Sequence, residues 1–148
     1  MKKNLFLLAM LMSATILTAS ASPAAGADPR TEKNFQQQFA GAQNVHWEKV
    51  GEGFSKVSFT WGGHRTEAYY DQSGQLAGSI RGLFFEQLPL SVVRAVGSSF
   101  RDAVVIEVRE ITNDEGTNYR LVLEKNNKKF KVRLNSYGAL IEKERIRN

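Results

Sequence analysis

The sequence predicts an α+β fold built from a tandem repeat, in which each copy is a helix followed by a four-stranded antiparallel sheet. The first observation is an internal period: a shift of 61 residues, or of 64 past the next turn, places apolar positions on apolar positions. The second is the alternation of apolar and polar residues in short segments, which is typical of strands with one covered face. The third is the Gly- and Asn-containing turns between those segments. The period matches Phe35, Phe39, Val45 and Trp47 with Val96, Phe100, Ile106 and Val108, and Val57, Phe59, Ala68 and Tyr70 with Leu121, Leu123, Val132 and Leu134.

Residues 1–21 have the composition of a secretory signal peptide. Two lysines precede the apolar stretch Leu5–Leu17, and small residues ending at Ala21 or at Ala27 provide two possible cleavage sites. The apolar stretch is shorter than the roughly 20 residues that span a membrane, so we expect cleavage rather than a retained anchor. Residues 22–30 are rich in Ala, Gly and Pro and are expected to form a spacer. The mature chain is therefore predicted to be periplasmic or secreted, with no transmembrane segment.

Composition narrows the chemistry further. The chain has no cysteine, which excludes disulfides, thiol nucleophiles and thiolate metal sites. The formal charge of +5 falls to +3 without the two N-terminal lysines, and residues 83–148 carry all of that excess because residues 28–82 are neutral. Such a mild asymmetry differs from the strong basic field of a nucleic-acid binder, so we expect no nucleic-acid partner.

The first copy is expected over residues 31–82. Asp28 can cap a helix that has Pro29 in its first turn, and Phe35 and Phe39 lie four residues apart on one helix face. Four strands should follow, and their apolar side chains should face that helix. The strands are expected around Val45–Trp47, Val57–Trp61, Ala68–Tyr70 and Leu76–Ile80, with turns at Gly51–Gly53, Gly62–Gly63 and Asp71–Gly74.

The second copy is expected over residues 83–148. Pro89 begins a helix in which Val92, Val96 and Phe100 recur every four residues. A lone copy of about 60 residues would be only marginally stable, so we expect the two copies to pack together, either on one shared sheet or as two sheets. Strands are expected at Val104–Ile111, Tyr119–Leu123, Phe130–Leu134 and after Gly138, with turns at Thr112–Gly116, Asn126–Asn127 and Asn135–Gly138.

Four segments form a pattern that is similar to a known family. They are Asn44–Trp47, Phe54–Phe59, Ala68–Gly74 and Leu88–Pro89. The pattern resembles the PepSY-like domains of exported Bacteroidetes-type proteins, which are related in fold to the β-lactamase inhibitor protein (BLIP). The resemblance covers about residues 30–146 and implies the binding or inhibition of an exported enzyme through a sheet surface. It implies no catalytic residues, and the cysteines that brace the secreted inhibitor are missing from this chain.

No cluster of residues predicts catalysis, a cofactor or a metal. His46 and His64 lack the spacing of metal ligands. Glu67 and Asp71 share a strand face, but basic residues on the neighbouring strand favour ion pairs there. The segment Asp71–Gly74 superficially resembles a calcium loop, yet its copy has no carboxylate, which favours an ordinary turn. A hydrolase stays as an alternative that would need a polar cleft with carboxylates of shifted pKa.

Two groups of side chains are candidates for contact with a partner. Outward-facing aromatic residues in the first copy have the character of an interface hot spot, with packing against helices as the alternative. A basic strand in the second copy presents three cations on one face, which Glu107, Glu124 and Glu142 on nearby strands could neutralise. The predicted contact face comprises His46, Trp61 and Tyr69 in the first copy and Lys129, Lys131 and Arg133 in the second.

The sequence thus predicts an exported, non-enzymatic binding module that presents a sheet face to an exported or envelope protein and inhibits it by occlusion. The alternative is a structural or stress-related envelope protein that binds an anionic surface through the basic strand. Inward positions and turns match between the copies, whereas the outward faces differ. We therefore expect any activity to lie where the copies differ.

Overall fold

The structure of the chain is a computed structural model that describes residues 27–147, so the predicted signal peptide lies outside the described residues. The described part contains two α-helices, one short 3-10 helix and eight strands. In chain order they are α1 (Pro29–Gln38), β1 (Gln43–Val50), β2 (Phe54–Trp61), β3 (His64–Tyr70), β4 (Leu76–Gly82), η1 (Phe85–Gln87), α2 (Leu90–Ser99), β5 (Val104–Asn113), β6 (Gly116–Lys125), β7 (Lys128–Asn135) and β8 (Leu140–Ile146).

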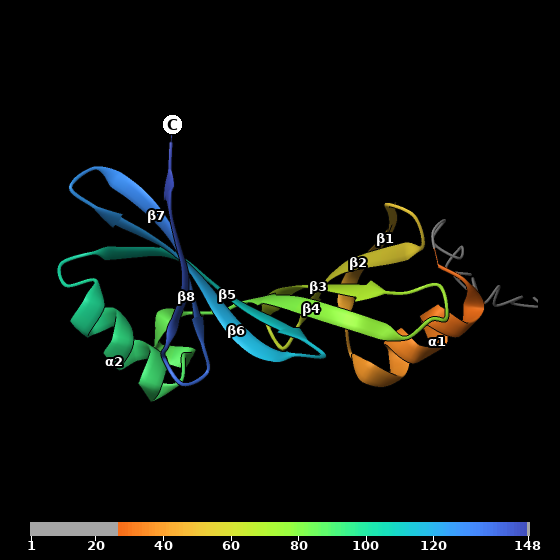
Figure 1. The fold of residues 1–148 in the computed structure, drawn as a ribbon. Coiled ribbons are helices and arrows are strands. Elements are labelled where there is room, and N and C mark those ends of the chain that lie inside the picture. Colours follow the sequence, from red (N-terminus) through yellow and green to blue (C-terminus); the bar gives the residue numbers. More distant parts are fainter. Residues whose placement is uncertain (1–26, 148) are drawn as a thin grey trace, which may run out of the picture.

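The eight strands form one antiparallel sheet whose spatial order is the chain order, β1 to β8. The two α-helices lie toward opposite ends of this sheet and on the same side of it (Figure 1). The predicted α+β class is therefore confirmed, and the question of one sheet or two is answered. The sheet is continuous because β4 pairs with β5 across its middle, from Gly78 opposite Asn113 to Gly82 opposite Arg109.

The strand β5 runs past the end of β4. After Gly82 the chain leaves the sheet through η1 and α2, and the amide of Leu83 makes one more hydrogen bond, 3.1 Å to the carbonyl of Val108. Residues 104–107 of β5 then pair with β6 alone. This step in the sheet leaves an opening beside β5.

Each α-helix covers its own apolar cluster on the same face of the sheet. Under α1 the cluster is aromatic: the ring of Phe35 meets Trp47 and Phe59 edge-on, with centroids 5.4 and 4.9 Å apart. Under α2 it is mainly aliphatic. Full burial of such a side chain contributes about 1.5–3 kcal/mol, so these clusters hold the helices in place. The buried members are Phe35, Trp47, Val57, Phe59, Ala68 and Tyr70 in the first, and Leu88, Val92, Val96, Val108, Tyr119, Leu121, Leu123, Val132 and Leu134 in the second.

Two matched turns join the last strands of each half. The side chain of Asp71 accepts hydrogen bonds from the amides of Ser73 and Gln75, and Asn135 accepts the equivalent pair from residues 137 and 139. Gly138 sits at φ +84°, and a Cβ there would lie 2.5 Å from the carbonyl oxygen of Ser91 in α2. The turn interpretation of both segments is confirmed, and the second turn packs closely on its helix.

Two residues expected in the core point away from it. Val45 is 39% exposed and Ile106 is 48% exposed. In both places the strand register shifts, between Gln43 and His46 in β1 and between Val105 and Glu107 in β5. A bulge inserts one extra residue and turns the following side chains to the other face. The period paired Val45 with Ile106 correctly, but the prediction that both face inward was wrong.

Candidate functional site

The outer face, defined as the face of the sheet opposite the two helices, carries every second side chain of the strands. Because side chains alternate along a strand, the residues between buried neighbours point outward. On β3, for example, Glu67 and Tyr69 flank the buried Ala68 and face outward. The outer face of β7 carries Lys129, Lys131 and Arg133 in the same way. Of the six predicted contact residues, the outer face holds His46, Tyr69, Lys129, Lys131 and Arg133.

Trp61 does not join this group. Its indole N–H donates a 3.1 Å hydrogen bond to the carbonyl of Ala40, and its ring meets that of Phe39 edge-on at 5.4 Å. Both partners follow α1, so Trp61 packs at the end of the aromatic cluster on the helix side. His46, in contrast, is exposed on the outer face of β1, where it lies opposite Ser58.

The cations of β7 are largely matched by carboxylates on the edge strand β8. Lys131 Nζ lies 3.4 Å from a carboxylate oxygen of Glu144, and Arg133 Nη2 lies 3.3 Å from one of Glu142. Such exposed pairs contribute about 0–1 kcal/mol each to stability, but they neutralise the strip. Glu142 therefore plays the neutralising role expected of it, and Lys129 is the strip's one cation without an ion pair among residues 27–147.

Tyr69 stands on the outer face of β3 beside two charged groups. Its hydroxyl donates a 3.3 Å hydrogen bond to Glu67. Burial raises the pKa of the Tyr69 phenol, and the neighbouring Glu67 carboxylate raises it further, so the hydroxyl stays protonated. Directly opposite Tyr69, Lys56 makes an ion pair with Glu48. Around Tyr69 the outer face thus carries an aromatic ring beside a pair of opposite charges.

A trough runs along the outer face of β4, in the middle of the sheet. The outward positions of this strand are Gly78, Ile80 and Gly82, so two of its three outward positions have no side chain. The side chains of β3 and β5 consequently face each other across β4. We name this feature the β4 trough; its walls are Arg65, Glu67 and Tyr69 on β3 and Arg109, Ile111 and Asn113 on β5.

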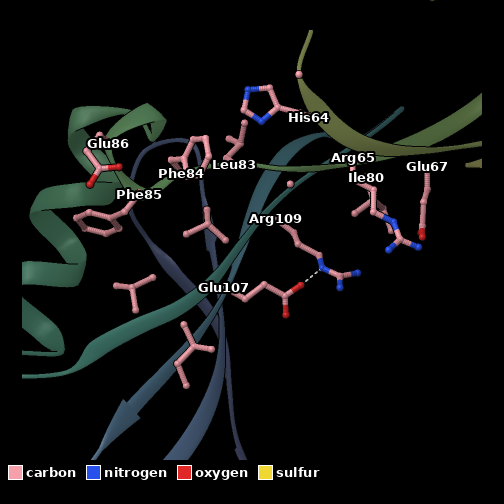
Figure 2. Close-up of a pocket in the computed structure, with 15 residues that line it drawn as sticks. His64, Arg65, Glu67, Ile80, Leu83, Phe84, Phe85, Glu86, Glu107 and Arg109 are labelled. Atoms are coloured by element: carbon pink, nitrogen blue, oxygen red, sulfur yellow. Dashed lines mark hydrogen bonds and ion pairs between the residues drawn. The ribbon is translucent and has the colours of Figure 1, made fainter. Parts of the chain in front are cut away.

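Two adjoining hollows make up the β4 trough. The one over Gly78 has a volume of about 400 Å³ and is lined mainly by apolar groups. The one over Gly82 has a volume of about 670 Å³ and extends into the opening beside β5. Figure 2 shows Arg65 and Glu67 from β3 and Arg109 from β5 around this second hollow. Ile80 lines both hollows and lies at the border between them.

A row of arginines runs across three strands from the second hollow, which Arg109 lines. Arg109, Arg120 and Arg133 lie directly opposite one another on β5, β6 and β7. Like charges in this position repel and destabilise a sheet. Arg109 makes an ion pair with Glu107 and Arg133 with Glu142, while Arg120 has no ion pair among residues 27–147. The sequence reasoning missed this row because it appears only once the register of three strands is known.

We also searched residues 27–147 for a metal site and for a membrane-spanning helix. No group of three or more His, Asp or Glu side chains there is placed to hold a metal ion. Within the same range, no helix has the length and apolar character needed to cross a membrane. His64, one of the two histidines, lies against the Phe84 ring at a centroid distance of 5.9 Å and near the amide of Gln87.

Comparison with known proteins identifies the fold. No family model and no curated protein matches the chain. A BLIP-like protein from Bacteroides fragilis is similar over 87% of this chain and 91% of its own, with 20% identity and a TM-score of 0.72. A protein from Bacteroides eggerthii, described as one proposed to be periplasmic, is similar over 81% and 89%, with 16% identity and a TM-score of 0.72. A DUF2874 family protein from Bacteroides ovatus is similar over 79% and 86%, with 17% identity and a TM-score of 0.70. The chain therefore has the fold of a BLIP-like protein, as its resemblance in sequence predicted.

Proposed function

We propose that the mature protein is an exported, non-enzymatic binding module that holds a protein partner on the outer face of its sheet. Residues 1–21 would direct export, and the two helix-plus-four-strand units, 31–82 and 83–148, would form one rigid support. The partner would be another exported or envelope protein. Binding would act by occlusion, because a broad face covers the partner's surface without needing any chemistry of its own.

The observation that carries this proposal is the apolar hollow on the outer face. Phe54 is 44% exposed and Val50 is 39% exposed, and both line the hollow over Gly78 together with Tyr69 and Ile111. Apolar patches rimmed by polar residues on a soluble protein mark interaction sites. The charged Lys56 and Glu67 lie beside Tyr69 at the edge of the patch, as polar residues do at the rim of protein interfaces.

The predicted contact residues take different parts in this arrangement. Tyr69 lines the apolar hollow, and His46 stands at the edge on β1. Lys129, Lys131 and Arg133 form a distant rim on β7, where they would guide the approach of an acidic partner rather than anchor it. The fold of the BLIP-like protein from Bacteroides fragilis supports the proposal, since a BLIP-like name refers to an inhibitor.

Site-specific crosslinking tests the proposed function. A photoreactive amino acid placed at Ser58, on the outer face of β2, should crosslink mature protein to a partner in an envelope extract. The same amino acid at Arg94, exposed on α2, serves as the matched control and should give no such product. Equal products from both positions, or a product from Arg94 alone, would show that the outer face is not the interface.

The alternative, attachment to an anionic surface through the basic strand, is supported by the uncompensated Lys129 and Arg120. The ion pairs of Lys131 and Arg133 with β8 weaken it, because they neutralise two of the four cations of β7. Binding to anionic vesicles that is steeply salt-dependent and lost in Lys129→Ser would favour this alternative over the protein-binding proposal.

A further inference from the structure

We propose that the β4 trough binds an extended segment of the partner, which places an apolar side chain over Gly78 and a carboxylate over Gly82. This inference rests on the proposed function and specifies the chemistry of the partner. The two glycines are four residues apart on one strand, which corresponds to about 13 Å. An extended chain lying along β4 would therefore present the two side chains from positions four residues apart on one face.

Gly82 is the first reason to assign a ligand to the trough. A Cβ at this position would meet only the carbonyl oxygen of Arg65, at an ordinary 3.7 Å, and its φ lies outside the left-handed region. The fold thus has no need of glycine there, although glycine in a strand interior costs about 0.5–1 kcal/mol relative to alanine. Gly78 differs, because a Cβ there would lie 2.9 Å from the Thr112 carbonyl oxygen. Close approach of a ligand or of another backbone is one of the known reasons for a glycine in a strand, and we assign it here.

The charges at the same end of the trough favour an anionic group. Arg65 is exposed and has no ion pair among residues 27–147, and Arg109 shares its charge with Glu107 through Nε. Arg120 stands directly opposite Arg109 without a carboxylate partner in that range. Two other carboxylates line this hollow: Glu67, which accepts a hydrogen bond from Tyr69, and Glu86, which lies at the η1 end away from Arg65 (Figure 2). Arg65 is thus a guanidinium beside Gly82 without a carboxylate partner in the described part of the chain, and a carboxylate placed over Gly82 would accept a bidentate contact from it.

The other end of the trough selects a polypeptide rather than a simple anion. The hollow over Gly78 is apolar, with Val50, Phe54, Tyr69 and Ile111 in its walls. Inorganic phosphate or a polyanion would leave these side chains exposed. A peptide segment satisfies both ends because it can carry an apolar side chain and a carboxylate on one backbone.

The second half of the molecule fills the matched positions of its sheet with side chains of its own. At the offset of 64, Gly78, Ile80 and Gly82 of β4 correspond to Glu142, Glu144 and Ile146 of β8. There the chain supplies its own carboxylates to the cations of the neighbouring strand, as the pairs with Lys131 and Arg133 show. In β4 two of the three matched positions are glycine, so this strand leaves its outer face open to a ligand.

Peptide selection tests the inference. A phage-displayed library of random 12-residue peptides is selected on immobilised mature protein, and one enriched peptide is synthesised. We expect enriched peptides to carry a large apolar residue and an Asp or Glu four positions apart. Replacing that acid by its amide should weaken binding about tenfold, as expected for a charge-assisted bidentate contact.

Two variants locate the peptide in the trough. Gly82→Val fills it with a side chain that suits a strand, so the variant should fold at least as stably as the parent and bind the peptide at least about tenfold more weakly. Arg65→Gln, at an exposed position, should cause a similar loss for the acidic peptide and none for its amide counterpart. Gly97→Ala, in α2 with open space around its Cβ, is the matched control and should bind normally.

Other results would overturn the inference. These are a library without enrichment, enriched peptides without a carboxylate, or a peptide that Gly82→Val and Arg65→Gln both bind normally. A dimer in sedimentation that Gly82→Val dissociates would assign the trough to a second copy of the chain instead. If Gly82→Val leaves crosslinking from Ser58 unchanged, the outer face still binds the partner and only the assignment of the trough fails.

Discussion

Each half of the sheet packs one α-helix on an apolar cluster, but the two clusters are built from different side chains. The outer faces of the two halves also differ. Under α1 the core is a cluster of rings, and under α2 it is mainly aliphatic. The outer face of the first half has an aromatic hollow and glycines on β4, whereas that of the second half has cations paired with β8. The comparison teaches that one face specifies the fold while the other is free to acquire a binding role.

The largest expected effect is a loss of stability when a side chain is removed from one of the two apolar clusters. Phe35 and Val96 occupy matched positions and are both 4% exposed. Phe35→Ala should lower the free energy of unfolding by about 3–5 kcal/mol, because it leaves a cavity among Phe39, Trp47 and Phe59. Val96→Ala, which removes two methyl groups, should cost about 2 kcal/mol. Urea denaturation measures both, and equal losses would contradict the account of a ring-based first core.

The matched turns offer a second test. Gly138→Ala should destabilise the protein by at least about 2 kcal/mol, because its Cβ would strike the backbone of Ser91 at a positive φ. Gly74→Ala should cost less, about 1 kcal/mol, since its nearest neighbour is a side-chain atom, Thr31 Oγ1 at 3.0 Å. Thermal unfolding of the two variants gives the order. A larger loss for Gly74→Ala would show that the first turn packs more tightly than its copy.

Removing the acidic residues of β8 sharpens the contrast between the outer faces. Glu142→Gln and Glu144→Gln should each lower the free energy of unfolding by less than about 1 kcal/mol, because both ion pairs are exposed. The double variant should bind acidic peptides weakly on β7, whereas the parent protein should bind them only at β4. Calorimetry with the peptide selected on the parent would detect this second site, and a single site in the double variant would speak against the comparison.

The smallest effect concerns pH. Hydrogen bonds from Ser73 and from the amide of Gln75 hold the pKa of Asp71 below its ordinary value, whereas the matched Asn135 does not titrate. A folded-state pKa below the unfolded value gives stability that is present above the unfolded pKa, about 3.9, and is lost as pH falls through the folded pKa. Asp71→Asn should therefore show a smaller loss of stability in acid than the parent. Acid titrations followed by NMR and circular dichroism measure this, and identical acid profiles would rule it out.

Most of the helices, strands and turns could be predicted from the sequence, because local residue patterns determine them. Alternation located the strands, the positive φ of Asn126 and Asn127 matches the tight turn expected there, and Asp28 caps α1 by accepting hydrogen bonds from the amides of Arg30 and Thr31. These features depend on a few neighbouring residues. Local chemistry therefore predicts them well.

The features that sequence reasoning missed depend on contacts between distant strands. The bulges near Val45 and Ile106 turn apolar side chains outward. A pattern of alternating residues does not reveal such an inserted residue. Trp61 follows the parity of a core residue and packs on Phe39, so its position at a strand end beside a turn did not place it on the outer face. The sequence reasoning gave Gly78 and Gly82 no role, because only the pairing of β4 with β5 places side chains on both sides of them.

The central claim, that binding resides on the outer face along β4, can be mapped directly. Isotope-labelled mature protein is titrated with the selected acidic peptide, and the amide chemical shifts are followed by NMR. The account predicts that the largest changes occur at Gly78, Ile80 and Gly82 and at facing residues of β3 and β5, with β8 and α2 unaffected. Changes centred on α2 or on β8, with β4 unmoved, would contradict it.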